Sequence, residues 1–115
     1  MKNRRAHVRY EASVTAEIEL RGETLVGESR DISEGGASVV FAANVPDGSK
    51  IALTLILTQD GIEDPDHEPF TAEASVMWSA PQDDGRAMMG LRFANVSAAQ
   101  KKQLNHFLAA LAKRS

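Results

Sequence analysis

The feature that most constrains the fold is an alternation of apolar and polar residues at a period of two. It is strictest near the middle of the chain, where Ile51, Leu53, Leu55 and Leu57 follow one another at every second position. A β-strand has this period because successive side chains point to opposite faces of a sheet. The pattern therefore predicts a strand with one buried and one exposed face.

The same alternation recurs along most of the chain and predicts six strands. They cover residues 14–20, 24–31, 37–41, 51–57, 72–78 and 89–93. Turn-forming residues separate them at 21–23, 34–36, 45–49 and 81–85. The acidic stretch 59–69 contains two prolines and is expected to be a solvated loop. Six antiparallel strands at this spacing favour a barrel or a sandwich.

A helix is predicted near the end of the chain, over about residues 97–112. Ser97 is a suitable N-cap, and the apolar stripe consists of Leu104, Phe107, Leu108 and Leu111. This stripe would serve equally to cap the barrel or to support a homodimer.

The charge distribution predicts a small anionic ligand. The net charge is −3, yet residues 1–9 contain four basic residues and no acidic one, so acidic residues dominate elsewhere. Binding of DNA or RNA needs many phosphate contacts over a broad surface, which this distribution does not favour. We expect residues 1–12 to form a flexible basic arm and residues 13–115 a single domain.

Other chemistry classes are disfavoured by composition. The 115 residues include no cysteine, and the three histidines are isolated from one another. The acids of 59–69 do not follow the spacing of a calcium loop. We therefore expect no metal site and no cofactor. No apolar run approaches the length of a membrane span, so a cytoplasmic location without membrane contact is expected.

Two short polar signatures contain the candidate site residues. The first is Arg5-Ala6-His7-Val8-Arg9, preceded by Arg4, and the second is Asp31-Ile32-Ser33-Glu34-Gly35-Gly36. Guanidinium groups make paired hydrogen bonds to phosphates and to base edges. Taken separately, the first could be a solvated basic tail and the second a turn closed by its own side chains. The turn and a binding role could also coexist.

These signatures resemble those of the PilZ domain family. The resemblance extends to Trp78, to the segment Gly90-Leu91-Arg92-Phe93 and to the closing amphipathic helix, so it covers essentially the whole chain. It implies a PilZ-like split barrel of six antiparallel strands, closed by a C-terminal helix. It also implies binding of the bacterial second messenger cyclic di-GMP, because both binding signatures of the family are intact.

The resemblance also assigns a role to each residue. Arg5 and Arg9 would contact phosphate and guanine, Asp31 and Ser33 the guanine edge, and Gly36 would allow close approach of the backbone. The presence of Arg4 directly before the first signature implies, by the same resemblance, that two intercalated ligand molecules bind rather than one. Gly35 and Trp78 are further candidates, although we expect Trp78 first as a residue of the core or the barrel rim, with stacking on a base as the alternative.

The function expected from these features is that of a receptor or adaptor. Ligand binding would change the conformation of the arm and signal to a separate, unidentified protein that regulates motility or biofilm formation. The alternative is an interaction module of pilus or motility machinery that binds no nucleotide. An enzyme is not expected, because Ser33 has no evident base partner and no paired carboxylates converge. The chain could be a monomer or a homodimer.

Overall fold

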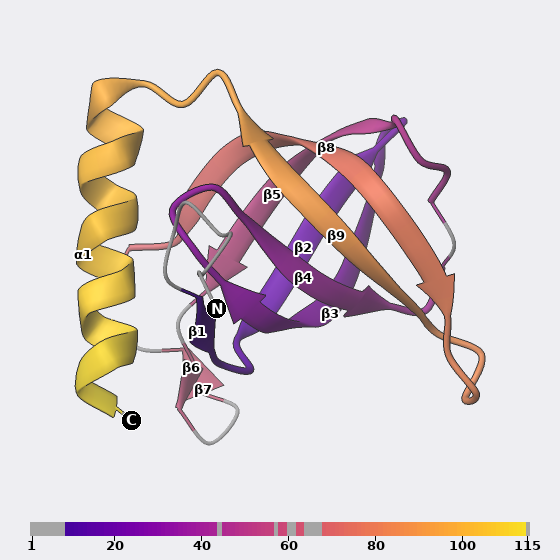
Figure 1. The fold of residues 1–115 in the computed structure, drawn as a ribbon, viewed down its shortest axis with the longest axis horizontal. Coiled ribbons are helices and arrows are strands. Elements are labelled where there is room, and N and C mark those ends of the chain that lie inside the picture. Colours follow the sequence, from indigo (N-terminus) through magenta and orange to yellow (C-terminus); the bar gives the residue numbers. More distant parts are fainter. Residues whose placement is uncertain (1–8, 44, 57, 60–61, 64–67, 115) are drawn as a thin grey trace, which may run out of the picture.

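A closed six-stranded antiparallel barrel forms the body of the protein (Figure 1). The computed structural model describes residues 9–43, 45–56, 58–59, 62–63 and 68–114. The barrel strands are β2 (Thr15–Leu20), β3 (Glu23–Ile32), β4 (Gly36–Phe41), β5 (Lys50–Ile56), β8 (Phe70–Pro81) and β9 (Ala87–Ala94). Their order is β3-β2-β5-β8-β9-β4, and pairing of β3 with β4 closes the cylinder. The predicted barrel is confirmed, and the sandwich is ruled out by this closure.

The core lies inside the cylinder and is built by the alternation seen in the sequence. Strand β5 buries Ile51, Leu53 and Leu55, while the residues between them are exposed or half-buried. Two aromatic rings, those of Phe70 and Phe93, meet edge to face with centroids 5.4 Å apart. Such apolar contacts contribute the largest favourable share of the folding free energy.

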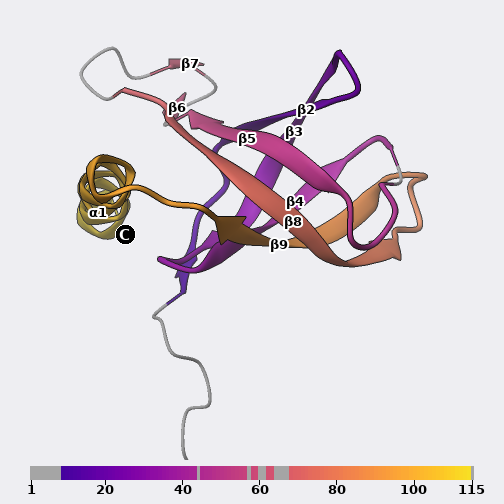
Figure 2. The same ribbon diagram turned by 90° about the horizontal axis from the view of Figure 1, so that it is seen from above.

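Helix α1 (Ala98–Arg114) packs against the outside of the barrel (Figure 2). The predicted stripe of Leu104, Phe107, Leu108 and Leu111 is buried there. Ser97 caps the helix as expected: its Oγ accepts from the Gln100 N–H at 3.1 Å, and the Gln100 side chain accepts from the Ser97 N–H at 2.9 Å. This reciprocal pair is a capping box. The stripe thus packs on the chain's own barrel.

The structure differs from the expected arm at its C-terminal end. Strand β1 (Tyr10–Glu11) pairs with Ile32 and Asp31 of β3, and Ala12 packs against the core. Residues 10–11 therefore belong to the sheet and Ala12 to the edge of the core, although we expected the arm to extend to residue 12. Half-burial of Tyr10 gives the physical reason, since this apolar ring leaves water on joining the sheet. Residues 1–8 lie outside the described residues.

The acidic segment also differs from the expected loop. Strands β6 (Thr58–Gln59) and β7 (Ile62–Glu63) form a two-stranded hairpin that overlaps its beginning. The expectation of a solvated loop over 59–69 was wrong at this point, because Thr58 and Ile62 are β-branched residues that favour strands. Among the described residues, no helix has the length and apolar character needed to cross a membrane.

Candidate functional site

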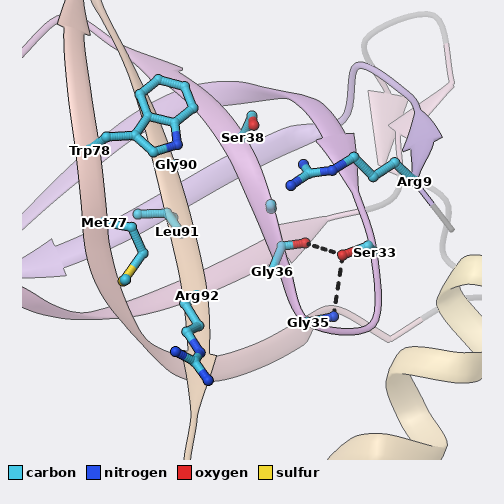
Figure 3. Close-up of a pocket in the computed structure, with 11 residues that line it drawn as sticks. Arg9, Ser33, Gly35, Gly36, Ser38, Met77, Trp78, Gly90, Leu91 and Arg92 are labelled. Atoms are coloured by element: carbon cyan, nitrogen blue, oxygen red, sulfur yellow. Dashed lines mark hydrogen bonds between the residues drawn. The ribbon is translucent and has the colours of Figure 1, made fainter. Parts of the chain in front are cut away.

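A pocket lies on the outer face of the three neighbouring strands β4, β9 and β8 (Figure 3). In the strand register, Ser38 of β4 and Trp78 of β8 both lie opposite Gly90 of β9, and Gly36 lies opposite Arg92. Because alternate residues share a face, small residues of β4 and β9 form the floor of the pocket. Its volume is about 380 Å³, and its walls include Arg9, Ser33, Gly35, Met77 and Trp78.

A β-bulge in β8 builds the wall opposite Arg9. The register shifts between Val76 and Trp78, so Met77 is an extra residue without its own partner on β9. A bulge can turn two consecutive side chains to the same side of a sheet, which regular alternation forbids. Met77 and Trp78 are accordingly both exposed, by 52% and 43%. The result is an apolar wall of a thioether and an indole.

Gly90 allows the indole of Trp78 to lie against the floor. A Cβ atom added at Gly90 would collide with the pyrrole part of the ring, at Nε1 and its neighbours. Any other residue at this position would therefore force the indole away. Trp78 lies at the rim of the pocket, with one face of its ring supported by the backbone of β9 (Figure 3).

The second signature forms a tight turn between β3 and β4. The Ser33 hydroxyl accepts from the Gly35 N–H at 3.2 Å and donates to the Gly36 carbonyl oxygen at 3.4 Å. The Ser33 N–H donates to the same carbonyl at 2.8 Å. The expected turn closed by its own serine is confirmed. Ser33 is also buried against the pocket, so a binding role for it stays a prediction.

An ion pair joins the two signatures. Arg9 Nη1 lies 2.6 Å from Asp31 Oδ1, and both side chains are partly exposed. Asp31 does not line the pocket, whereas Arg9 does. The carboxylate therefore holds the guanidinium at the pocket edge by a charge-assisted hydrogen bond. The other candidates of the first signature, Arg4 and Arg5, lie outside the described residues.

Ser29 determines how the chain reaches Arg9, and sequence reasoning missed it. Strands β1 and β2 both pair with β3, but the ladder breaks between them around Ser13. At this break the buried Ser29 hydroxyl donates to the Ala12 carbonyl at 2.5 Å and accepts from the Val14 N–H at 3.0 Å. The Ser29 hydroxyl thus serves the two backbone groups that the ladder leaves unpaired, while the Ala12 N–H and the Val14 carbonyl keep backbone partners on β3.

Gly36 has a packing role that the sequence did not reveal. An added Cβ there would collide with the Leu91 carbonyl oxygen of the neighbouring strand. The absence of a side chain is therefore required for β4 to approach β9, whether or not a ligand is bound. The carbonyl oxygen of the preceding residue, Gly35, accepts a hydrogen bond from the Phe93 N–H at 2.9 Å. Ligand contact at Gly35 and Gly36 stays a prediction.

The acidic residue with a shifted pKa lies away from this pocket. The pKa of Asp84 is lowered, because the backbone N–H and then the guanidinium of Arg86 donate to its carboxylate. This residue belongs to the turn between β8 and β9 and does not line the pocket. Within the described ranges, no group of three or more acidic, histidine or cysteine side chains is placed to hold a metal ion.

Comparison with known proteins identifies the fold and the family. A sequence model of the PilZ domain matches residues 3–110. The structure of the PilZ domain of YcgR from Escherichia coli with c-di-GMP has a TM-score of 0.73 and 20% identity, and covers 97% of this chain and 94% of that one. Comparison with curated proteins found no match.

Two further structures share the fold but are longer proteins. The Bacillus subtilis inhibitor of motility MotI/DgrA has a TM-score of 0.76 and 21% identity over 99% of this chain. The MrkH–c-di-GMP complex of K. pneumonia has a TM-score of 0.71 and 15% identity over 96%. The present chain spans 53% and 52% of their lengths, respectively.

Proposed function

Because this chain belongs to the PilZ domain family, we propose that it is a receptor for cyclic di-GMP that binds in the pocket between Arg9 and Trp78. The observation that carries the proposal is the convergence of both signatures on one pocket. Arg9 of the first signature and Ser33, Gly35 and Gly36 of the second all line it, although they are far apart in sequence. Trp78 adds an aromatic face from a third segment.

The chemistry of the pocket suits this ligand. Cyclic di-GMP offers two phosphates and two guanines, and arginine can contact a phosphate, the guanine edge or the plane of a base. The exposed indole of Trp78 offers a surface on which a base can stack. Asp31 can accept from guanine N–H donors if Arg9 moves toward a phosphate. Arg4 and Arg5 would supply additional guanidinium groups from the arm.

The proposed signal is a change in the arm. Arg4, Arg5 and Arg9 repel one another, and ligand phosphates would neutralise that repulsion and draw residues 1–9 over the pocket. The altered surface would then be recognised by a separate protein of the bacterial cytoplasm, in motility or biofilm regulation. Two ligand molecules, stacked on one another, would use Arg4 as well as the two arginines of the first signature.

Isothermal titration calorimetry with cyclic di-GMP tests the proposal. The unsubstituted chain should bind, with a stoichiometry of one or two, and Arg9→Ala should weaken binding at least tenfold. Loss of a charge-assisted hydrogen bond typically costs about 1.5–3 kcal/mol, which corresponds to that factor or more. Arg21→Gln is the matched control, because Arg21 is exposed in the β2–β3 turn and does not line the pocket.

The result of the titration decides between two functions, a receptor for cyclic di-GMP and an interaction module that binds no nucleotide. Binding that is lost in Arg9→Ala and retained in Arg21→Gln supports the receptor. Absence of binding by the unsubstituted chain, or equal binding by both variants, would reject the proposed site. A melting temperature for Arg9→Ala equal to that of the unsubstituted chain excludes unfolding as the cause.

A further inference from the structure

The pocket contains a hydroxyl group that neither signature includes. Ser38 of β4 is only 6% exposed and lines the pocket (Figure 3), and its hydroxyl group makes no hydrogen bond with a described residue. Its Oγ atom nevertheless keeps some solvent-accessible surface. Buried hydroxyl groups are almost always hydrogen-bonded. A hydroxyl that opens only onto a pocket therefore finds its partner among the atoms that occupy that pocket.

A second polar group outside the signatures is the guanidinium of Arg92 on β9. It lines the pocket on the side away from Arg9 (Figure 3) and forms no ion pair with a described acidic residue. Arg9, by contrast, is bound to Asp31. Arg92 thus contributes a positive charge to the pocket that no described carboxylate neutralises.

The strand register places these two residues close together. Ser38 lies directly opposite Gly90, and Arg92 is two residues further along β9 on the same outer face. Diagonal neighbours of this kind are about 7–8 Å apart and within reach of a long side chain. Gly90 has no side chain to separate them. Figure 3 shows the guanidinium of Arg92 pointing away from Ser38, so this side chain must turn toward Ser38 for one phosphate group to meet both residues.

We propose that Ser38 and Arg92 form a phosphate-binding subsite of the pocket, outside the two signatures. This inference rests on the proposed function, because the phosphate would be one of those of the bound cyclic dinucleotide. Arg92 can only donate hydrogen bonds and Ser38 can donate one. No described carboxylate lines the pocket to accept from the N–H groups of a base. A donor set of this kind matches phosphate oxygens better than the Watson–Crick edge of guanine, whose N–H groups need an acceptor.

Calorimetric titration of the full chain with cyclic di-GMP tests the subsite through Arg92→Gln and Ser38→Ala. We expect Arg92→Gln to weaken binding about tenfold or more and Ser38→Ala about threefold to tenfold, the usual effects of a charged and a neutral hydrogen bond. Arg21→Gln is again the control for loss of one exposed positive charge. Melting temperatures of all variants are measured alongside.

The salt dependence of binding distinguishes contact from a structural effect. A direct charge contact is screened by salt, so the affinity of Arg92→Gln should fall less steeply between low and high salt than that of the unsubstituted chain. Ser38→Ala should keep the original salt dependence. If the unsubstituted chain binds and both variants bind equally well, the subsite is refuted while the proposed function stands. If the unsubstituted chain does not bind, both are refuted.

Discussion

At the scale of single residues, two glycines shape the pocket for different physical reasons. Gly36 allows the backbones of β4 and β9 to approach, whereas Gly90 makes room for the indole of Trp78. The first contact is with a carbonyl group that cannot move without disturbing the barrel. The second is with a side chain whose other face is exposed. Substitutions at these two positions should therefore have different consequences.

We expect Gly90→Ala to move the indole without unfolding the protein. The added methyl group collides with the ring, which can rotate toward solvent. The free energy of unfolding should therefore fall by less than the ~1–3 kcal/mol typical of overpacking in a sealed core. Trp78 is the one tryptophan in the chain, so its fluorescence emission reports the movement directly. Binding of cyclic di-GMP should weaken as well.

A double-mutant cycle provides the control for this prediction. In a Trp78→Ala background the collision is gone, so adding Gly90→Ala should have little further effect on binding. Equal effects of Gly90→Ala in both backgrounds would show that Gly90 does not act through the indole.

Some of these residues could be predicted from sequence and others could not. Arg9, Ser33, Gly35 and Gly36 follow from the two signatures, and all four line the pocket. The outward orientation of Trp78 could not be predicted, because period-two alternation with Ala74 and Val76 places it inside the barrel and only the bulge turns it outward. Ser29 has no local signal either, since its two partners lie fifteen or more positions away.

At the scale of elements, the break between β1 and β2 links the barrel to the arm. Strand β1, which follows Arg9, pairs with the end of β3, and this pairing brings Arg9 to Asp31. The Ser29 hydroxyl bridges the break, alongside backbone hydrogen bonds between Ala12 and Arg30 and between Ser29 and Val14. The stability of this one junction therefore affects how well Arg9 is placed at the pocket.

We expect Ser29→Ala to lower the free energy of unfolding by about 1–3 kcal/mol. The substitution leaves the Ala12 carbonyl and the Val14 N–H without their partner, and unsatisfied buried groups cost about this much. Urea denaturation measures the change. Ser13→Ala, at the same break, removes an exposed hydrogen bond to Glu28 and should change stability by no more than about 0.5 kcal/mol. Similar losses in both variants would contradict the role of Ser29.

The elements themselves were predictable where the pattern was long. All six barrel strands and α1 follow from their periodicity, and Ser97 marks the start of the helix. Strands β1, β6 and β7 have two residues each, too few to establish a period. Their pairing depends on contacts with other parts of the chain, as between Tyr10 and Ile32.

At the scale of the whole molecule, barrel closure places the pocket and the helix on one connected framework. Alternation alone left a barrel and a sandwich open, because it does not specify that β3 pairs with β4. Helix α1 contacts both β1 and β8. Strand β1 continues from Arg9, and β8 contains Trp78, so both walls of the pocket are connected to the helix.

The charge distribution supports the same account at this scale. The chain is acidic overall, yet its described pocket is lined by Arg9 and Arg92 and by no described carboxylate. An anionic ligand is thus attracted to one place and repelled by most of the remaining surface. This arrangement suits a small nucleotide better than an extended nucleic acid.

The central claim is that cyclic di-GMP binds in the pocket on β4, β9 and β8. A crystal structure of the chain with saturating cyclic di-GMP tests it most directly. We expect the nucleotide between Arg9 and Trp78, with a base against the indole and a phosphate within hydrogen-bonding distance of Ser38 or Arg92. Nucleotide bound at a different surface, or a pocket that stays free of nucleotide at saturating concentration, would contradict the claim.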